Sequence, residues 1–401
     1  MELDFPNLRH LRAFMEVSDA GGISAASHRV HLSQPAVTQA IAGLEARFGV
    51  KLLDRRPEGM FPTPEGEVLL LRVRRMFGIL AQGAGRALRL AGRRDGKPVA
   101  DFHARATAAQ LRALVAIGEA GSFSLAARNL AISQPSIHRA GRDLERLSGL
   151  KLFLPGRRGI ELTPQAEAFS RAVKLAGAEL AQGLDELTRL RGQDATRIRV
   201  GSMPLSRTEI LPGACDALLR EAAGVQIRLV DAPYSELLRE LRHGDLDVLI
   251  GALRDPLPAE DVVQERLFDD SLAVVVRPDH PLAGRAGLSL ADTLAYPWIA
   301  PPKETPAGAY LFRALGIGRL EKTPVRVVTS SMVLVRGMLS RGDYLTILSP
   351  RQAAVEIAQG LMVPLDLPLP GSERPIGITT RADWMPTPTQ ARFLEHVRAA
   401  V

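Results

Sequence analysis

The sequence predicts a multidomain protein: two small helical domains, each with a β-wing and a long following helix, and then a two-lobed α/β domain. Three observations lead to this fold class. The chain has 401 residues, enough for two to four domains. Its first half contains a repeat with a period of one hundred residues. From Arg197 onward, apolar strand patterns alternate with helical patterns, which is typical of a parallel sheet.

Composition limits the classes of protein. Hydrophobic residues make up 46% of the chain and charged residues 24%, so it can bury sizeable cores and is not a disordered chain. Cys215 is the single cysteine, which excludes an intrachain disulfide and a multi-thiolate metal site. The sequence has no run of about 18 apolar residues for a membrane span, and its start, MELDFPNLRH, lacks the features of a secretory signal. We therefore expect a cytoplasmic protein that makes no contact with a membrane.

Charge is unevenly distributed along the chain. Residues 1–200 carry 30 Lys/Arg and 20 Asp/Glu, a net charge of +10, whereas residues 201–401 carry 21 and 24, a net charge of −3. The first half is therefore the one suited to a polyanion such as DNA. Uneven charge is common among soluble proteins, so this observation alone does not decide the function.

The repeat indicates a duplicated domain. Residues 11–64 match residues 111–164 without a gap at 19 of 54 positions. A period this long, present only twice, differs from the short periods of solenoid proteins. The segments that recur one hundred positions later include Leu11-Arg12-Ala13, Ser33-Gln34-Pro35, Leu44-Glu45, Lys51-Leu52 and Thr63-Pro64.

Each copy is predicted to contain three helices and a wing. In the first copy, apolar residues at helical spacing predict a helix that ends at Gly21, and Ser24 can cap a short second helix. Ser33 is a good N-cap for the third helix, with Pro35 in its first turn. The predicted elements are helices over residues 8–20, 25–30 and 33–48 and a wing over residues 51–64, and the second copy repeats this punctuation.

These motifs carry a family resemblance. In both copies Ser-Gln-Pro is followed by Ala-Val or Ser-Ile, and a later Leu-Glu pair precedes Gly-Val-Lys-Leu or Gly-Leu-Lys-Leu. Each copy thus resembles the winged helix-turn-helix domain of LysR-type transcriptional regulators. The combination with this spacing is far more specific than any single element, since Ser-Gln-Pro alone would be only a helix cap.

The geometry of a helix-turn-helix assigns candidate DNA contacts. The N-terminal part of the second helix of the motif enters the major groove, and wing arginines suit phosphates or the minor groove. The candidates in the first copy are Ser33, Gln34, Pro35, Ala36, Thr38, Gln39, Arg55 and Arg56. The candidates in the second copy are Ser133, Gln134, Ser136, His138, Arg139, Arg142, Arg157 and Arg158.

The two copies are not equivalent. The recognition helix of the first is poor in cations, whereas the second has Arg139 and Arg142. The second places Gly141 where the resemblance leads one to expect isoleucine, at a cost of roughly 1 kcal/mol in helix propensity. We expect both modules to contact DNA, with the second supplying more of the electrostatic affinity. The alternative is that one copy is structural or serves dimerisation.

The segments after the modules complete the expected domain organisation. Residues 64–91 and 164–191 begin with proline and acidic first turns and resemble the linker helices of LysR-type proteins. The resemblance implies that the second of them pairs antiparallel across a homodimer or within a homotetramer. The expected divisions are a first winged domain over 1–64, a linker helix and joint over 65–105, a second winged domain over 106–164, a dimerisation linker helix over 165–195 and an effector domain over 196–401, with its second lobe at roughly 272–368.

The C-terminal half is expected to be a two-lobed effector domain, similar to a periplasmic solute-binding protein. In open α/β sheets, ligands bind beyond the carboxyl ends of strands, near helix N-termini. Hydroxyls at such places favour a small carboxylate or a sugar-like metabolite, although Ser330 could equally be a helix cap and Lys303 a solvated charge. The candidate effector contacts are Ser202, Met203, Pro204, Tyr234, Lys303, Thr329, Ser330 and Thr346.

The sequence therefore predicts a DNA-binding transcriptional regulator controlled by a small molecule, without cofactor, metal or catalytic residues. Its expected partners are double-stranded DNA, the effector, other copies of the chain and RNA polymerase. An α/β enzyme is the alternative from another class, but the nucleophile-elbow, P-loop, zinc-protease and dinucleotide motifs are absent. Cys215 lies in an apolar helical stretch and is expected to be a core residue rather than a nucleophile.

Overall fold

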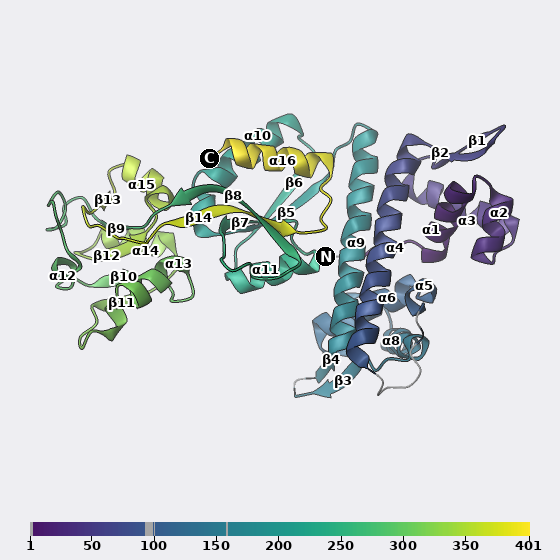
Figure 1. Ribbon diagram of the computed structural model, residues 1–401, viewed down its shortest axis with the longest axis horizontal. Helices are drawn as coiled ribbons and strands as arrows, with labels where there is room; N and C mark the ends of the chain where they lie inside the picture. The colour runs from purple at the N-terminus through teal and green to yellow at the C-terminus, as the bar shows by residue number, and fades with distance from the viewer. Residues whose placement is uncertain (1–2, 93–98, 100, 158) are drawn as a thin grey trace.

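The computed structural model describes residues 3–92, 99, 101–157 and 159–401. Figure 1 shows two long helices side by side, with one small helical module to their right, a second at their lower end and an elongated two-lobed α/β domain to their left. We call residues 3–63 module 1 and residues 101–163 module 2. Within the described residues no helix is long and apolar enough to cross a membrane.

The two modules contain the same elements in the same order. Module 1 consists of α1 (Leu8–Ala20), α2 (Ile23–Val30), α3 (Gln34–Phe48), β1 (Leu53–Arg56) and β2 (Gly59–Pro62). Module 2 adds a short helix, α5 (Phe102–Arg105), before its own α6 (Ala108–Ala120), α7 (Phe123–Asn129), α8 (Gln134–Ser148), β3 (Phe153–Gly156) and β4 (Gly159–Leu162). Each β-hairpin pairs its strands in the same register, shifted by one hundred residues.

Local sequence explains most of these boundaries. The side chains of Ser33 and Ser133 accept hydrogen bonds from the third residue beyond them, and each helix that follows has proline in its first turn. Gly49 and Gly149 end these helices at φ +67°, the left-handed region that favours glycine. The expected cap at Ser24 is wrong, because α2 begins one residue earlier at Ile23 and Ser24 lies within its first turn.

The cores of the two modules differ at two neighbouring positions, where a smaller side chain at one is compensated by a larger side chain at the other. Module 1 buries Ile41 and Leu53 at positions where module 2 has Gly141 and Phe153. A Cβ on Gly141 would lie 3.2 Å from the Phe153 ring and 3.2 Å from Ile117, so the larger ring fills the space that the missing side chain leaves. The glycine therefore costs helix propensity but leaves no cavity in this core.

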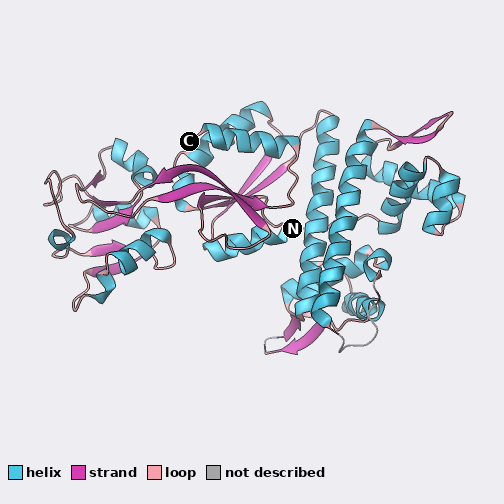
Figure 2. Cartoon of the chain, viewed as in Figure 1, coloured by secondary structure: helices cyan, strands magenta, loops and turns pink. Residues whose placement is uncertain are grey.

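The two long helices pack against each other along their length. They are α4 (Pro64–Ala91) and α9 (Pro164–Leu190), and they run antiparallel (Figures 1 and 2). Thr63 and Thr163 cap them through their hydroxyls. The family resemblance implied that α9 pairs with a second copy of the chain, whereas α9 packs here on α4 of the same chain. Both helices have an apolar stripe of the same spacing, and a stripe does not specify which helix covers it.

The first lobe of the α/β domain is a five-stranded sheet in the order β6-β5-β7-β14-β8. Helices α10 and α16 pack together in one core cluster, and α11 contributes to another. The strands are β5 (Arg197–Ser202), β6 (Gln226–Val230), β7 (Val248–Ala252), β8 (Val262–Asp270) and β14 (Arg374–Arg381), and the helices are α10 (Ile210–Glu221), α11 (Tyr234–His243) and α16 (Pro388–Ala399). With β14 and α16 the chain returns to this lobe from the second, which agrees with the expected end of the second lobe at roughly residue 368.

The second lobe has a five-stranded sheet in the order β11-β10-β12-β9-β13, with β8 and β14 connecting the two lobes. The central strands, such as β12, are buried along their whole length. The strands are β9 (Ala273–Val276), β10 (Trp298–Ala300), β11 (Val325–Val328), β12 (Leu345–Leu348) and β13 (Val363–Pro364). The helices are α12 (Leu290–Thr293), α13 (Pro306–Ala309), α14 (Met332–Leu339) and α15 (Ala354–Ala358), with shorter turns η1 (Pro204–Arg207) in the first lobe and η2 (Tyr310–Ala314), η3 (Ile317–Arg319) and η4 (Pro350–Ala353) in the second.

The first lobe docks on the linker helices through buried polar contacts. Lys174 of α9 forms ion pairs with Asp245 beyond α11, at 2.5 Å, and with Glu119 of module 2, at 2.7 Å. Arg171, one turn earlier, pairs with Asp261 at the start of β8. One face of α9 therefore holds both module 2 and the first lobe.

Candidate functional site

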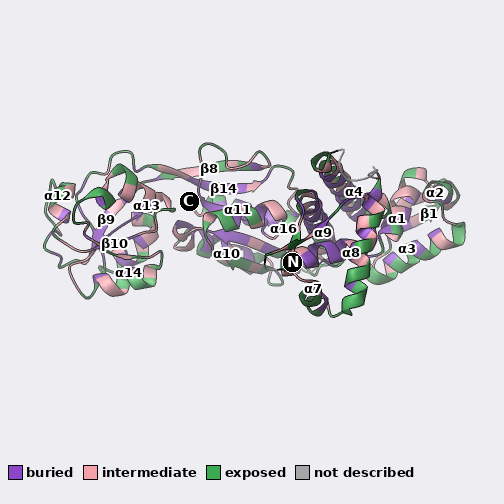
Figure 3. Ribbon diagram, turned by 90° about the horizontal axis from the view of Figure 1, so that it is seen from below, coloured by how far each residue is buried: buried purple, intermediate pink, exposed green. Residues whose placement is uncertain are grey.

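The first turn of α3 presents polar groups to solvent. Gln34, Pro35, Thr38 and Gln39 are exposed, whereas Val37 on the other side of the helix is fully buried. The outer side of α3 is exposed along its length (Figure 3). A helix that buries one side and exposes the first turn of the other can enter a DNA major groove.

The wing of module 1 lies beside this turn. One surface depression is lined by Gln34, Pro35 and Thr38 of α3 together with Arg55 and Arg56 of the wing. The Arg56 guanidinium lies over the Phe61 ring, 5.4 Å from its centroid. The structure thus brings five of the eight residues predicted for the first copy to one concave surface, and of the other three, Ser33 caps α3, Gln39 is exposed and Ala36 is half-buried.

Module 2 presents the corresponding residues differently. Gln134, Ser136 and Arg139 are exposed on the first turns of α8, and the hydroxyls of Ser133 and Ser136 lie 2.7 Å apart. The imidazole of His138 is tilted against the ring of Phe123, with 4.9 Å between the ring centroids. The contact with Phe123 of α7 therefore fixes the direction in which the exposed edge of the His138 imidazole points.

The arginines predicted for module 2 are not equally available. Arg142 donates from Nη1 to Glu145 at 2.6 Å, and this carboxylate also accepts from the backbone N–H of Leu152 at 2.8 Å. Arg142 is therefore partly neutralised within the module. Arg157 is exposed on the wing, and Arg158 lies outside the described residues.

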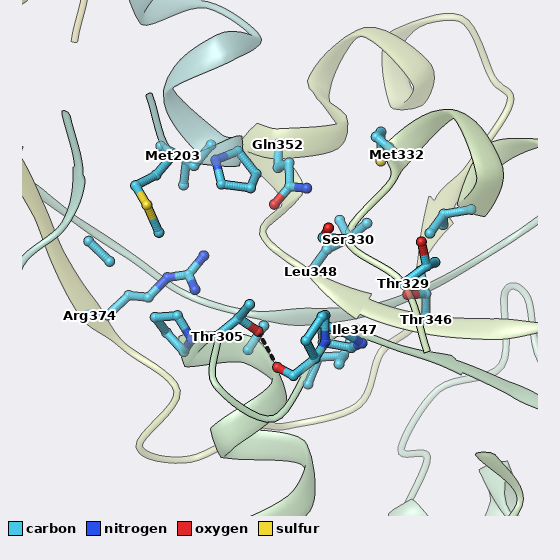
Figure 4. A pocket seen from close by; sticks show the side chains of 18 of the residues that line it. Met203, Thr305, Thr329, Ser330, Met332, Thr346, Ile347, Leu348, Gln352 and Arg374 are labelled. Atoms are coloured by element: carbon cyan, nitrogen blue, oxygen red, sulfur yellow. Dashed lines mark hydrogen bonds between the residues drawn. The ribbon is translucent and has the colours of Figure 1, made fainter. Parts of the chain in front are cut away.

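A pocket of about 730 Å³, part of it open to solvent, lies between the two lobes of the α/β domain (Figure 4). Its walls are mainly apolar, with Leu205 and Ile376 from the first lobe and Val335, Ile347 and Leu348 from the second. A mainly apolar lining with a few polar groups is typical of a site for a small organic molecule.

The polar groups of the pocket divide into engaged and available ones. Thr305 Oγ1 donates to the carbonyl of Pro302 at 2.7 Å, the dashed line of Figure 4, and Thr346 Oγ1 donates to the carbonyl of Ile299 at 2.8 Å. No hydrogen bond to another described residue occupies the Ser330 hydroxyl or the Gln352 side-chain amide, and both groups line the cavity. These two side chains can therefore bind a ligand without breaking an existing bond.

Arg374 is the cation among the described residues that line the pocket. It begins β14, where the chain returns to the first lobe, and its Nε and Nη2 donate to Asp270 Oδ2 at 3.2 and 3.0 Å. Asp270 ends β8, the other connection between the lobes, and its second oxygen accepts from the Ser349 hydroxyl at 2.6 Å. A ligand carboxylate bound to the remaining Nη1 of Arg374 would therefore contact the Arg374–Asp270 ion pair, which links β14 to β8, the two strands that connect the lobes.

The pocket collects five of the eight predicted effector residues. Met203, Pro204, Thr329, Ser330 and Thr346 line it. The expectation that Ser330 could be a cap is wrong, because Ser331 caps α14.

The other three predicted effector residues do not line the pocket. The Ser202 hydroxyl donates to the carbonyl of Val230 and accepts from Arg207, Tyr234 lies beneath the Arg254 guanidinium, and the Lys303 ammonium lies over the Phe312 ring. Burial raises the pKa of the Tyr234 hydroxyl, and the nearby Arg254 opposes this shift. Arg374 was missed because it begins an antiparallel strand, β14. Gln352 lies in the turn η4 directly after β12, which is parallel to β10, so the rule of strand ends could have found it.

Comparison with known proteins decides the family. Residues 191–401, more than half of the chain, match the LysR substrate binding domain. Residues 8–67 and 108–167 each match the bacterial regulatory helix-turn-helix protein domain of the lysR family. The chain belongs to the LysR family. LysR proteins are DNA-binding transcriptional regulators with an effector-binding domain, which agrees with the expectation that this chain is not an enzyme.

Named LysR relatives match the chain over different lengths. The HTH-type transcriptional regulator GalR of Pseudomonas putida is 34% identical over 404 residues and covers 100% of this chain and 99% of its own length. The HTH-type transcriptional regulator PcaQ of Agrobacterium fabrum is 29% identical and covers 72% of this chain and 93% of its own length. A full-length OxyR variant from Pseudomonas aeruginosa has a TM-score of 0.51 at 22% identity over 73% of this chain and 93% of its own, a likeness of fold.

Proposed function

We propose that this LysR regulator reads promoter DNA with a tandem pair of winged helix-turn-helix modules and responds to a small anionic effector bound between its lobes. The observation that carries the proposal is the pair of recognition helices, α3 and α8, which have the same cap, the same exposed first turn and a wing beside them. The length of the GalR match supports a tandem arrangement, since PcaQ and OxyR leave more than a quarter of this chain unmatched. DNA as the partner places the protein in the cytoplasm.

The base-reading residues follow from exposure. The exposed polar groups of the first turns include Gln34, Thr38 and Gln39 on α3 and Gln134, Ser136 and Arg139 on α8. Phosphates are contacted by wing arginines and by the N-terminal N–H groups of the two helices. Because Arg142 of module 2 is paired with Glu145 and the wing of module 1 has two exposed arginines, we expect both modules to contribute to electrostatic affinity, rather than mainly the second.

A footprint on the DNA upstream of the gene tests this proposal. The variants are Gln34→Ala with Thr38→Ala in α3, and Ser136→Ala with Arg139→Ala in α8. We expect each pair to remove a different part of the protected region and to weaken binding by roughly ten-fold or more, because each base contact contributes about 1–3 kcal/mol. Arg47→Ala and Arg146→Ala are matched controls, since both arginines are exposed at the far ends of the same helices.

The possible results separate the alternatives. Loss of protection by one pair of substitutions only would mean that the other module is structural. No protection by the wild-type protein on its own promoter region would contradict the proposed operator.

The effector is proposed to be a carboxylate with an apolar body rather than a sugar. A sugar needs many hydrogen-bond partners, whereas the pocket offers three available polar groups, Ser330, Gln352 and Arg374 Nη1, on mainly apolar walls. Benzoate and glucose are suitable probes of the two classes in a thermal-shift assay. We expect benzoate to stabilise the wild-type protein and the Lys303→Met variant but not Arg374→Met, because the Lys303 ammonium lies outside the pocket. Stabilisation by glucose and not by benzoate would reverse the assignment.

A further inference from the structure

The contact between α4 and α9 has internal symmetry. A Cβ on Gly83 would lie 2.1 Å from the Cβ of Ala172, and a Cβ on Gly183 would lie 3.0 Å from the Cβ of Arg72. Adding one hundred converts Gly83 into Gly183 and Arg72 into Ala172. The two close approaches are therefore the same contact made twice, once in each direction, as an approximate two-fold axis between the helices requires.

The modules are attached to the two helices in the same way. The hydroxyl of Thr63 donates to the carbonyl of Lys51 at 2.7 Å, and that of Thr163 donates to the carbonyl of Lys151 at 2.8 Å. In addition, the first wing strand of each module is held by the glutamate of its recognition helix. Because each module is fixed to its own helix by the same bonds, the axis that relates the helices also relates the modules.

The charges on the two helices favour the pair of α4 with α9 over a pair of two α4 helices. Arg72 is fully buried and donates to Glu179 and to Glu186, in each case at 2.7 Å. The positions of α4 that correspond to these glutamates are Ile79 and Arg86. Two α4 helices in the same register would therefore place Arg72 against an apolar side chain and another arginine.

A pair of two α9 helices is disfavoured by the opposite charges. The residue of α9 that corresponds to Arg72 is Ala172, so Glu179 and Glu186 would lose their partner. Glu179 also accepts from Arg75 of α4 at 2.7 Å, and it is buried. An unpaired buried carboxylate is unfavourable, so α9 requires α4.

The two helices that pair belong to the same chain. Phe102, in the short helix α5 at the start of module 2, is fully buried with its ring centroid 4.8 Å from that of Phe169 in α9. Arg72 also donates to the carbonyl of Met385, which leads into the last helix of the first lobe. Phe102 comes only eleven residues after the end of α4 in the chain, so its packing on α9 gives α4 a high effective concentration there.

We infer that one chain is a complete DNA-reading unit, in which α4 and α9 replace the linker helices of two subunits, and that its operator consists of two unlike half-sites read in a fixed order. This inference rests on the proposed function. Glutamine pairs with adenine and arginine with guanine in the major groove. Because α3 presents Gln34 and Gln39 where α8 presents Gln134 and Arg139, the two half-sites differ in sequence. Higher assemblies of the chain then form through surfaces other than the α4–α9 pair.

Tethered DNA cleavage tests the order of the half-sites. Pro57→Cys and Arg157→Cys place an iron–EDTA probe at equivalent positions of the two wings, each in the full chain with Cys215→Ser. We expect the probe on module 1 to cut beside one half-site of a pair and the probe on module 2 to cut beside the other. Cutting of both half-sites of one pair by the same probe would overturn the inference. Absence of protection by the wild-type chain would instead be a failure of the proposed function.

Complementation between two variant chains provides a second test, which uses only the substitutions already introduced. The chain with Gln34→Ala and Thr38→Ala is co-expressed with the chain that carries Ser136→Ala and Arg139→Ala. If α4 pairs with α9 of its own chain, neither chain has two intact modules in one pair, and the mixture binds no more tightly than the better variant. A mixture that recovers wild-type protection would show that the helices pair between chains and would overturn the inference.

Discussion

Replacement of Arg72 by methionine is expected to loosen the α4–α9 pair. The guanidinium is fully buried, and its hydrogen bonds join α4 to two glutamates of α9 and to the backbone of the first lobe. Burial alone would lower the pKa of Arg72, but the hydrogen bonds to Glu186 and Glu179 outweigh it and hold the pKa above its usual value. Methionine retains most of the apolar stem and removes the charge.

The magnitude follows from the partners that are left behind. Removal of one member of a buried ion pair costs about 3–5 kcal/mol. We expect the lower end of this range, because Glu179 retains Arg75 and the Glu186 side chain is 15% exposed. Since about 1.4 kcal/mol is a factor of ten in an equilibrium, about 3 kcal/mol corresponds to an opening equilibrium roughly a hundred-fold more favourable.

Hydrogen exchange of peptides from α4 and α9 measures this opening directly. Arg74→Met is the matched control, since Arg74 lies on the same helix, is 50% exposed and forms a surface pair with Asp19. That variant should change exchange by less than about five-fold. Addition of Glu186→Gln to Arg72→Met should recover part of the protection, because it removes the carboxylate that Arg72→Met leaves without a partner. Exchange in Arg72→Met within five-fold of wild type would refute the role given to this cluster.

Other features of the structure lead to further predictions. Gly141→Ile should destabilise module 2 by about 1–3 kcal/mol through overpacking, and Phe153→Leu in the same chain should restore most of the loss, as measured by thermal unfolding. Thr163→Ala should cost about 1 kcal/mol in helix stability by removing the cap of α9, visible as faster exchange in its first turn. Burial, together with the charge of Lys174, lowers the pKa of His243 from 6.5 to about 4. Because this pKa is lowered on folding, neutral His243 makes its full contribution to the free energy of unfolding above about pH 6.5, and this contribution is lost as the pH falls toward 4. His243→Gln should flatten this part of the stability–pH curve, and an unchanged curve would contradict the assignment.

The sequence was sufficient to predict features that depend on a few neighbouring residues. A serine before a helical pattern commonly caps the helix, and a glycine after the pattern commonly ends it. Ser33 and Ser133 with Gly49 and Gly149 therefore placed the recognition helices correctly. The alternation of strands and helices also predicted both lobes. The long strand β8 was missed, because several of its residues are exposed and its pattern is mostly polar.

The partner of α9 could not be predicted in this way. The apolar stripes of α4 and α9 show that both helices are covered, but the choice between partners depends on Arg72 and Glu179, which are 107 residues apart. The role of Glu179 and Glu186 in the choice of partner can be recognised only when Arg72 is known to lie beside them. The effector pocket presented the same difficulty, since Arg374 comes from a connection between the lobes and its position depends on Asp270.

The covalent linkage of the two modules also has consequences for regulation in the cell. A regulator that must first find a second subunit occupies DNA in proportion to the square of its concentration when it is scarce. If α4 pairs with α9 of its own chain, as inferred, occupancy of one operator rises with the first power of concentration, so the response is less sensitive to gene dosage and to fluctuations in copy number. Such pairing would also prevent mixed dimers with other regulators of similar fold at this interface.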